Sequence, residues 1–220
     1  MHYIDAKLYL GLFFATEESL AKILPDPLRP SEMKLAGLMC GEMPCNETGT
    51  FMESGLLVQC MFDNPETGED EIGVHFAHNY VDTDVAMAIG REFWGYPRKL
   101  ADISMKWKGD KLVAKTVRHG ATLFKATCTF TDEGEWIDSG PNVNIKRIQN
   151  ALGDGFDASY ISAADLKYDV KNGRSGEVEI EIKDGPHDKV TIVEVESPMI
   201  GLYFDTDILL PKARVLIPME

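Results

Sequence analysis

Apolar and polar residues alternate along most of the chain, and this period of two predicts short β-strands, because successive side chains of a strand point to opposite faces. The clearest example is Glu177–Lys183, where Val178, Ile180 and Ile182 alternate with glutamates. Strands are also predicted over Ala6–Phe14, Leu35–Met39, Phe51–Phe62, Ile72–Val81, residues 103–108, Lys111–Val117, residues 122–130, Val190–Val195, Leu202–Phe204 and Ile208–Ile217. Many short strands and few helices indicate a mainly β (α+β) fold with an antiparallel sheet or barrel, since closure removes exposed strand edges.

Three segments carry the signals of short helices. Thr16 is placed to cap a helix that ends before Pro25. Asp84–Trp94 follows side chains that can cap a helix, and it stops before Pro97, which has no N–H and cannot continue a helix. Along this second helix Val85, Ala88, Ile89, Glu92 and Phe93 recur at helical spacing. A third helix is predicted over Ile145–Leu152.

The composition is that of a globular protein with an acidic surface. The 220 residues, 44% of them hydrophobic, are expected to form a single domain over residues 1–220. No apolar run is long enough to span a membrane, and the first residues lack the basic start of a signal peptide, so a cytoplasmic protein is expected. A net charge of −14 without a cluster of basic residues argues against nucleic acids and anionic membranes as partners.

The cysteines and histidines give little support to a metal site. None of the four cysteines forms a C-x-x-C pair, and reduced buried thiols are favoured over a disulfide between Cys40 and Cys45. His75 and His78 lie on a predicted strand, where residues three apart point to opposite faces and cannot share an ion. No metal ion and no cofactor are therefore expected. His78 alone, or Tyr80, could instead line a binding pocket.

Two adjacent cations, Arg98 and Lys99, follow the predicted helix Asp84–Trp94 and stand among aromatic residues. Cations are normally solvated, so a pair in apolar surroundings indicates a functional site. The stretch around them, GREFWGYPRKLA, resembles the signature of the acetoacetate decarboxylase superfamily: GRE, three residues, tyrosine or phenylalanine, then PKKL. Three further stretches are similar to the same family in the same order: SLAKILPDPL from Ser19, FMESG from Phe51 and LPKARV from Leu210.

The resemblance covers nearly the whole chain and implies a fold, a chemistry and a set of site residues. The implied fold is an antiparallel acetoacetate decarboxylase-like β-barrel with a few short helices, which assembles into a homo-oligomer. The implied partner is a small β-keto acid or related carboxylate. In the family a lysine forms a Schiff base with the keto acid, Glu53 would orient groups and move protons, and Tyr96 would help to shape the pocket.

This sequence departs from the family pattern at the chemistry. Arg98 stands at the Schiff-base position and Lys99 follows it, while Ala6 stands where the family has an active-site arginine. A guanidinium stays protonated and cannot form an imine at neutral pH. One hypothesis is therefore a decarboxylase-like lyase that uses Lys99 as nucleophile. The alternative is a family member without imine chemistry, an enzyme or a binding protein, in which Arg98 holds a small carboxylate.

Overall fold

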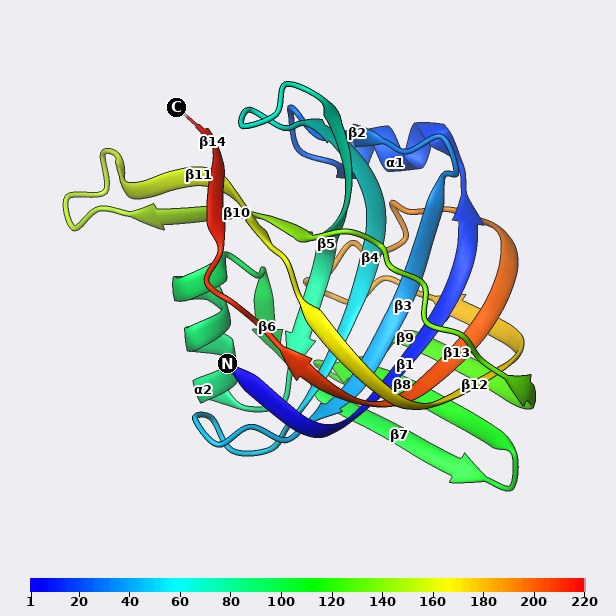
Figure 1. The fold of residues 1–220 in the computed structure, drawn as a ribbon. Coiled ribbons are helices and arrows are strands. Elements are labelled where there is room, and N and C mark those ends of the chain that lie inside the picture. The colour runs from blue at the N-terminus through cyan, green and yellow to red at the C-terminus, as the bar shows by residue number, and fades with distance from the viewer. Residues whose placement is uncertain (220) are drawn as a thin grey trace.

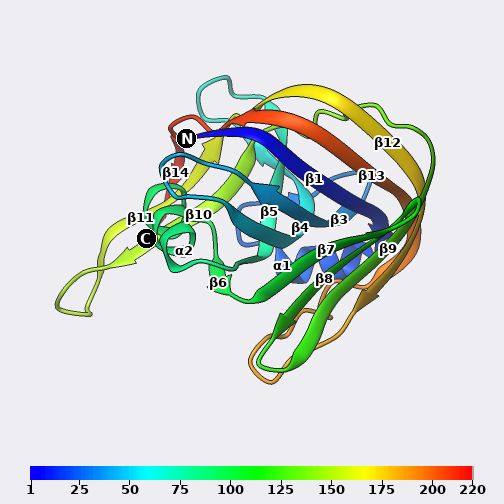
Figure 2. The same ribbon diagram turned by 90° about the horizontal axis from the view of Figure 1, so that it is seen from below.

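A computed structural model describes residues 1–219 as one highly curved, mainly antiparallel β-sheet (Figures 1 and 2). Its strands are β1 (His2–Ala15), β2 (Arg29–Pro30), β3 (Leu35–Met43), β4 (Phe51–Asp63), β5 (Asp70–Val81), β6 (Arg98–Leu100), β7 (Asp102–Lys108), β8 (Lys111–Arg118), β9 (Ala121–Glu133), β10 (Asn142–Gln149), β11 (Phe156–Ala164), β12 (Lys167–Ile182), β13 (Val195–Leu209) and β14 (Arg214–Pro218). The helices are α1 (Glu17–Ile23), α2 (Asp84–Ile89) and the π-helix η1 (Gly90–Trp94). The prediction of a mainly β fold is confirmed.

The predicted closure of the sheet into a barrel is not observed. The strand order is β14-β11-β10-β5-β4-β3-β1-β13-β12-β9-β8-β7, so β14 and β7 end the sheet without pairing to each other. The sheet instead curls until β7 packs across β3, β4 and β5 (Figure 2). This curvature gives the sheet an inner face, which β7–β9 enclose, and a second face.

Each face of the sheet has its own apolar core, and the alternation along single strands supplies both. In β1, Tyr9 and Phe13 enter the larger core, which also contains Phe124 of β9. Tyr3 and Leu8 of the same strand enter the second core beside Phe51, Met39 and Tyr96. Consecutive residues of one strand are therefore buried in different surroundings, and this separation decides which side chains can meet.

Two sequence predictions in the second half of the chain are wrong. Residues 145–149 belong to strand β10 and not to a helix, because β10 pairs with β11 in a hairpin whose turn falls at residues 150–155. Residues 190–194 form a loop and not a strand, because the carboxylate of Asp184 accepts hydrogen bonds from the backbone N–H groups of Val190 and Thr191. The two buried valines of that loop, Val190 and Val193, produced the strand-like pattern.

The helix predicted over Asp84–Trp94 is present, with Thr83 as its N-cap and Gly95 in the left-handed conformation at its end. Two details differ. The second half, η1, is a π-helix, and the buried residues of the segment are Ala86, Gly90 and Trp94. Val85 and Phe93, two of the residues at helical spacing, are 45% and 65% exposed. The small residues Ala86 and Gly90 face inward because they pack against the side chain of Arg98.

The histidine pair on β5 also differs from the prediction. A β-bulge falls between the pairs His78–Leu56 and Phe76–Leu57, so Ala77 is an extra residue. The two histidines therefore point to the same face of the sheet.

In the described part of the chain, no three residues of the metal-ligating types come together as they would around an ion. The four cysteines are free and buried, and burial raises the pKa of Cys40 to about 12.

No helix in residues 1–219 is long and apolar enough to cross a membrane.

Candidate functional site

Arg98 and Lys99 point to opposite faces of the sheet. Strand β6 lies parallel to β5, with Arg98 beside Asn79 and Lys99 beside Tyr80. Because side chains alternate along a strand, Arg98 enters the second core, where it is only 3% exposed. Lys99 lies on the other face, and its Nζ donates to Oδ1 of Asp188 at 2.7 Å.

Arg98 and Glu53 form a buried ion pair with several hydrogen bonds. Nη2 of Arg98 lies 2.8 and 2.9 Å from the two carboxylate oxygens, and Nε lies 3.1 Å from Oε1. The third nitrogen, Nη1, donates to the carbonyl of Ala86 at 2.8 Å. Burial alone would lower the pKa of Arg98, but the Glu53 carboxylate outweighs it and holds that pKa above its ordinary value.

The surroundings of this ion pair explain why the stretch GREFWGYPRKLA has a glycine at position 90 and a tyrosine at position 96. The guanidinium of Arg98 lies between the rings of Phe51 and Tyr96, 5.4 and 5.1 Å from their centroids. A Cβ atom at Gly90 would lie 2.5 Å from Cδ and Nη1 of Arg98. Only glycine therefore fits at position 90 while the arginine keeps this place. Asn79 completes the group, donating to Glu53 and accepting from Arg98.

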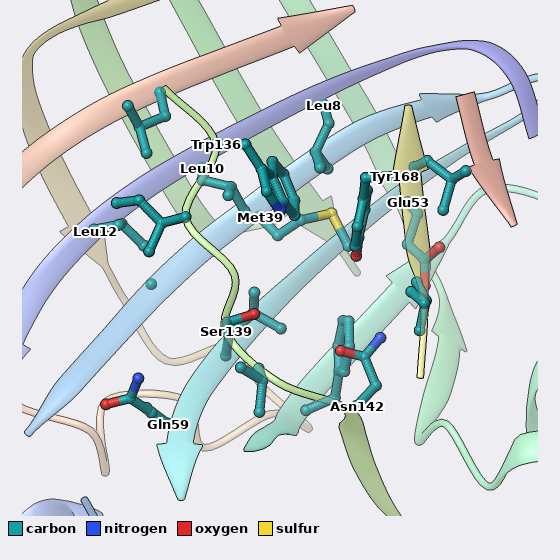
Figure 3. Close-up of a pocket in the computed structure, with 18 of the residues that line it drawn as sticks. Leu8, Leu10, Leu12, Met39, Glu53, Gln59, Trp136, Ser139, Asn142 and Tyr168 are labelled. Carbon is teal, nitrogen blue, oxygen red and sulfur yellow. The ribbon is translucent and has the colours of Figure 1, made fainter. Parts of the chain in front are cut away.

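A cavity of about 140 Å³ opens beside the ion pair (Figure 3). Glu53, Tyr96 and Arg98 all lie on its wall, as the sequence predicted. Its other walls include Tyr3, Leu8, Leu10, Leu12, Leu35, Gly37, Met39, Leu57, Gln59, Val74, Phe76, Trp136, Ile137, Ser139, Asn142, Leu166 and Tyr168. Within the described residues no lysine lines this cavity, so Arg98 is its only cation.

His78, Tyr80 and Lys99 were also candidate site residues, and the structure places them away from this cavity. His78 lies opposite Leu56 of the larger core, and burial, followed by the charge of Lys99, lowers its pKa. The Tyr80 hydroxyl lies 3.2 Å from Asp188. They do not line the cavity because all three side chains project from the face of the sheet opposite to Arg98.

Three tyrosines bring neutral hydroxyl groups to the Arg98 end of the cavity, and sequence reasoning found only Tyr96. Tyr3 and Tyr168 are the others. Burial, and then neighbouring groups that include Glu53, raise the pKa of all three phenols, so they are hydrogen-bond donors at neutral pH. Asn142 donates to the Tyr96 hydroxyl at 2.9 Å. Neither Asn142 nor Tyr168 belongs to a stretch that carried a sequence signal.

The two oxygens of Glu53 differ in their remaining capacity to accept hydrogen bonds. Oε1 accepts from Asn79 and from two nitrogens of Arg98, whereas Oε2 accepts from one nitrogen of Arg98. A carboxylate oxygen has two lone pairs, so Oε2 retains one for a ligand. Glu53 is therefore the acidic group with a free acceptor at the cavity wall.

The position of the family arginine holds no cation. Ala6 is fully buried in the second core, and the neighbouring Lys7 pairs with Asp205 at 2.6 Å. Lys7 does not line the cavity. A ligand in the cavity consequently meets one cation that is already paired, together with neutral donors.

Asp188 forms a separate polar cluster on the opposite face of the sheet. Its side chain is 1% exposed and accepts from Lys99 at 2.7 Å and from Arg118 at 2.6 Å. Burial tends to raise the pKa of Asp188, but the hydrogen bonds from these two cations outweigh it, and the pKa is lowered. The cluster fastens the loop after β12 to the strands β6 and β8.

Asp188→Asn is expected to lower the free energy of unfolding at neutral pH by about 2 kcal/mol, because it removes the acceptor that two cations share. Since the folded-state pKa of Asp188 is depressed, its contribution is present above the ordinary value of 3.8 and is lost as the pH falls through the lower folded pKa. Urea unfolding from pH 7 to pH 2 measures this. The variant should lose less stability on acidification than the parent; identical pH curves would contradict the assignment.

Comparison with known proteins adds to this geometry. The family model described as acetoacetate decarboxylase (ADC) matches residues 3–218. The acetoacetate decarboxylase of Clostridium acetobutylicum is 24% identical, over 94% of this chain and 86% of that protein. The crystal structure of acetoacetate decarboxylase from Legionella pneumophila superposes with a TM-score of 0.86 at 21% identity, covering 99% and 87% of the two chains. The enduracididine biosynthesis enzyme MppR, complexed with a condensation product of pyruvate and imidazole 4-carboxaldehyde, superposes with a TM-score of 0.82 at 14% identity, covering 98% and 88%.

Proposed function

The chain belongs to the acetoacetate decarboxylase family, and from this premise we propose that it binds a small keto acid or related carboxylate in the cavity and acts on it without a lysine imine. One observation carries the proposal. Arg98 takes the cavity-facing position of β6, whereas Lys99 projects to the other face and contacts Asp188. A guanidinium has no free amine lone pair to attack a ketone.

Glu53 is the group that we assign to proton transfer. Its Oε2 would accept a proton from the carbon next to the substrate carbonyl; as that C–H bond breaks, the electron pair moves to the carbonyl oxygen and an enolate forms. The phenols of Tyr96 and Tyr168 would donate hydrogen bonds to this oxygen. Return of the proton from Glu53 to carbon closes the cycle, so no co-reactant is needed.

Arg98 is a positioning residue in this proposal. All three of its nitrogens donate within the chain, and two of them hold the carboxylate of Glu53. A role as a clamp for the substrate carboxylate would require Glu53 to move away. Arg98 instead fixes the orientation of Glu53, while Asn79 occupies Oε1 and leaves Oε2 toward a ligand.

Glu53→Gln tests this assignment, because the amide has nearly the same shape as the carboxylate but cannot take the proton. Proton NMR in heavy water would follow hydrogen–deuterium exchange at the methyl carbon of pyruvate and the carbons beside the ketone of acetoacetate. The parent is expected to accelerate exchange, and Glu53→Gln should reduce the acceleration roughly 100-fold or more.

Lys99→Met is the matched control, since it changes a half-buried side chain on the opposite face and should leave exchange unchanged. Circular dichroism would verify that both variants are folded. Exchange that survives in Glu53→Gln and disappears in Lys99→Met would overturn the proposal.

A further inference from the structure

The cavity has a roof formed by the segment between β9 and β10, residues 134–141, which we call the strap. Figure 1 shows the strap crossing in front of β5, β4 and β3. Glycines bring it against the sheet at both ends: a Cβ at Gly134 would lie 2.6 Å from the backbone of Arg174, and one at Gly140 would collide with the carbonyl of Ile72. Between these points Trp136, Ile137 and Ser139 line the cavity.

The floor under the strap is apolar over most of its length. It consists of Leu8, Leu10, Leu12, Leu35, Gly37, Met39 and Leu57. Glu53 and Tyr168 lie at one end of the cavity, and Leu12 and Gln59 lie at the other (Figure 3). Glu53 and Gln59 are six residues apart on β4, which corresponds to about 20 Å along an extended strand. The cavity is therefore elongated, with its charged pair at one end.

The apolar floor and the strap come from different parts of the chain and line the same cavity. Trp136 stacks on Tyr168 with ring centroids 4.0 Å apart, and its other neighbour is Phe204 at 5.2 Å. These contacts hold the indole over the passage from the Tyr168 end of the cavity to the leucines of β1. A ligand with its carbonyl at Glu53 would have to continue beneath Trp136 to fill the rest.

The length of the cavity exceeds the needs of a four-carbon acid. Glu53 and Gln59, which mark its two ends, are about 20 Å apart along β4, whereas acetoacetate is a chain of only four carbons. Acetoacetate ends in a methyl group one carbon beyond its ketone. If acetoacetate were placed with that ketone at Glu53, Leu10, Leu12 and Trp136 would contact no apolar part of the ligand.

We propose that the ligand carries an apolar chain or ring, which lies between the strap and the leucines of β1. The class is thus a medium-chain or aryl-substituted keto acid, and the assignment rests on the proposed function only in placing the carbonyl at Glu53. Each methylene buried in the cavity should strengthen binding about fourfold.

Titration calorimetry of the full chain with freshly prepared acetoacetate, butyrylacetate and hexanoylacetate in the cold tests the proposal. Each acid has two methylenes more than the one before, so the dissociation constant should fall about 15-fold from acetoacetate to butyrylacetate, and again until the chain meets Gln59. Benzoylacetate should bind at least as tightly as butyrylacetate.

Ser139→Phe is the blocking variant, because Ser139 points from the strap into the cavity and a phenyl ring there would occupy the place of the chain (Figure 3). It should abolish the dependence on chain length. Glu135→Phe is the matched control, since it adds the same ring to an exposed position on the strap outside the cavity wall. It should keep the full dependence.

The results separate the two proposals. Equal affinity for the three acids in the parent, or an undiminished chain-length effect in Ser139→Phe, overturns the apolar-arm assignment while exchange at Glu53 still supports the proposed function. A chain-length effect that Ser139→Phe removes, together with unchanged exchange in Glu53→Gln, supports the apolar arm and refutes the role of Glu53.

Discussion

Arg98→Lys is expected to create a protein that forms an imine with acetoacetate, whereas the parent forms none. The new amine would take the cavity-facing position of β6, within reach of Glu53 and of the cavity space. Borohydride reduction followed by mass spectrometry would detect the imine as a stable adduct on residue 98. In the parent the same treatment should leave the mass unchanged, because the lysine beside this position projects from the other face.

The reactivity of the new lysine should depend on Glu53. Burial among Phe51 and Tyr96 disfavours the ammonium form and lowers the pKa of an amine, whereas the carboxylate of Glu53 favours the ammonium form and raises it. Combining Arg98→Lys with Glu53→Gln removes the second effect. Trapping by the double variant should therefore extend to lower pH than trapping by Arg98→Lys alone, provided that both are compared over a series from pH 5 to pH 9.

Lys99→Met supplies the control for the same experiment. Added to Arg98→Lys, it should leave the adduct in place, because the two side chains occupy different faces of the sheet. The competing hypothesis, in which Lys99 is the nucleophile, requires the parent to be trapped and Lys99→Met to prevent it. That result would show that the side chains of β6 exchange faces of the sheet in solution, or that Lys99 reaches the substrate by another route.

The sequence alone predicted much of what surrounds Arg98. The cap before Asp84, the stop at Pro97 and the glycine of GRE are local signals, and each is found at its place. Period-two alternation also implied that Arg98 and Lys99 diverge. It could not say which of them faces the cavity, because that depends on the pairing of β6 with β5, two segments separated by a helix.

Other features could not be predicted because they arise from contacts between distant segments. The bulge at Ala77 reverses the expected orientation of the two histidines, and only the register of β5 against β4 reveals it. Trp136 and Tyr168 meet because the strap crosses the sheet, and the strap itself has neither helical nor strand periodicity. The helical pattern of Ile145–Leu152 was overridden by the hairpin β10–β11.

The ion pair at the centre of the site leads to the second prediction, a large loss of stability. Glu53→Leu should lower the free energy of unfolding by about 3–5 kcal/mol, because it leaves the buried guanidinium of Arg98 without its carboxylate. Arg98→Met should be similarly costly, since it leaves the carboxylate of Glu53 buried and unpaired. Urea unfolding followed by circular dichroism measures both.

The double variant Glu53→Leu with Arg98→Met distinguishes an uncompensated charge from a packing defect. Both replacements are apolar and of comparable length, and the rings of Phe51 and Tyr96 already line the place of the guanidinium. If the cost of each single change is mainly the abandoned charge, the double variant should be more stable than either single variant by at least 2 kcal/mol, because no unpaired charge remains buried. Losses that simply add would mean instead that the ion pair is held by packing alone, and that Arg98 does not depend on Glu53 for its place in the cavity wall.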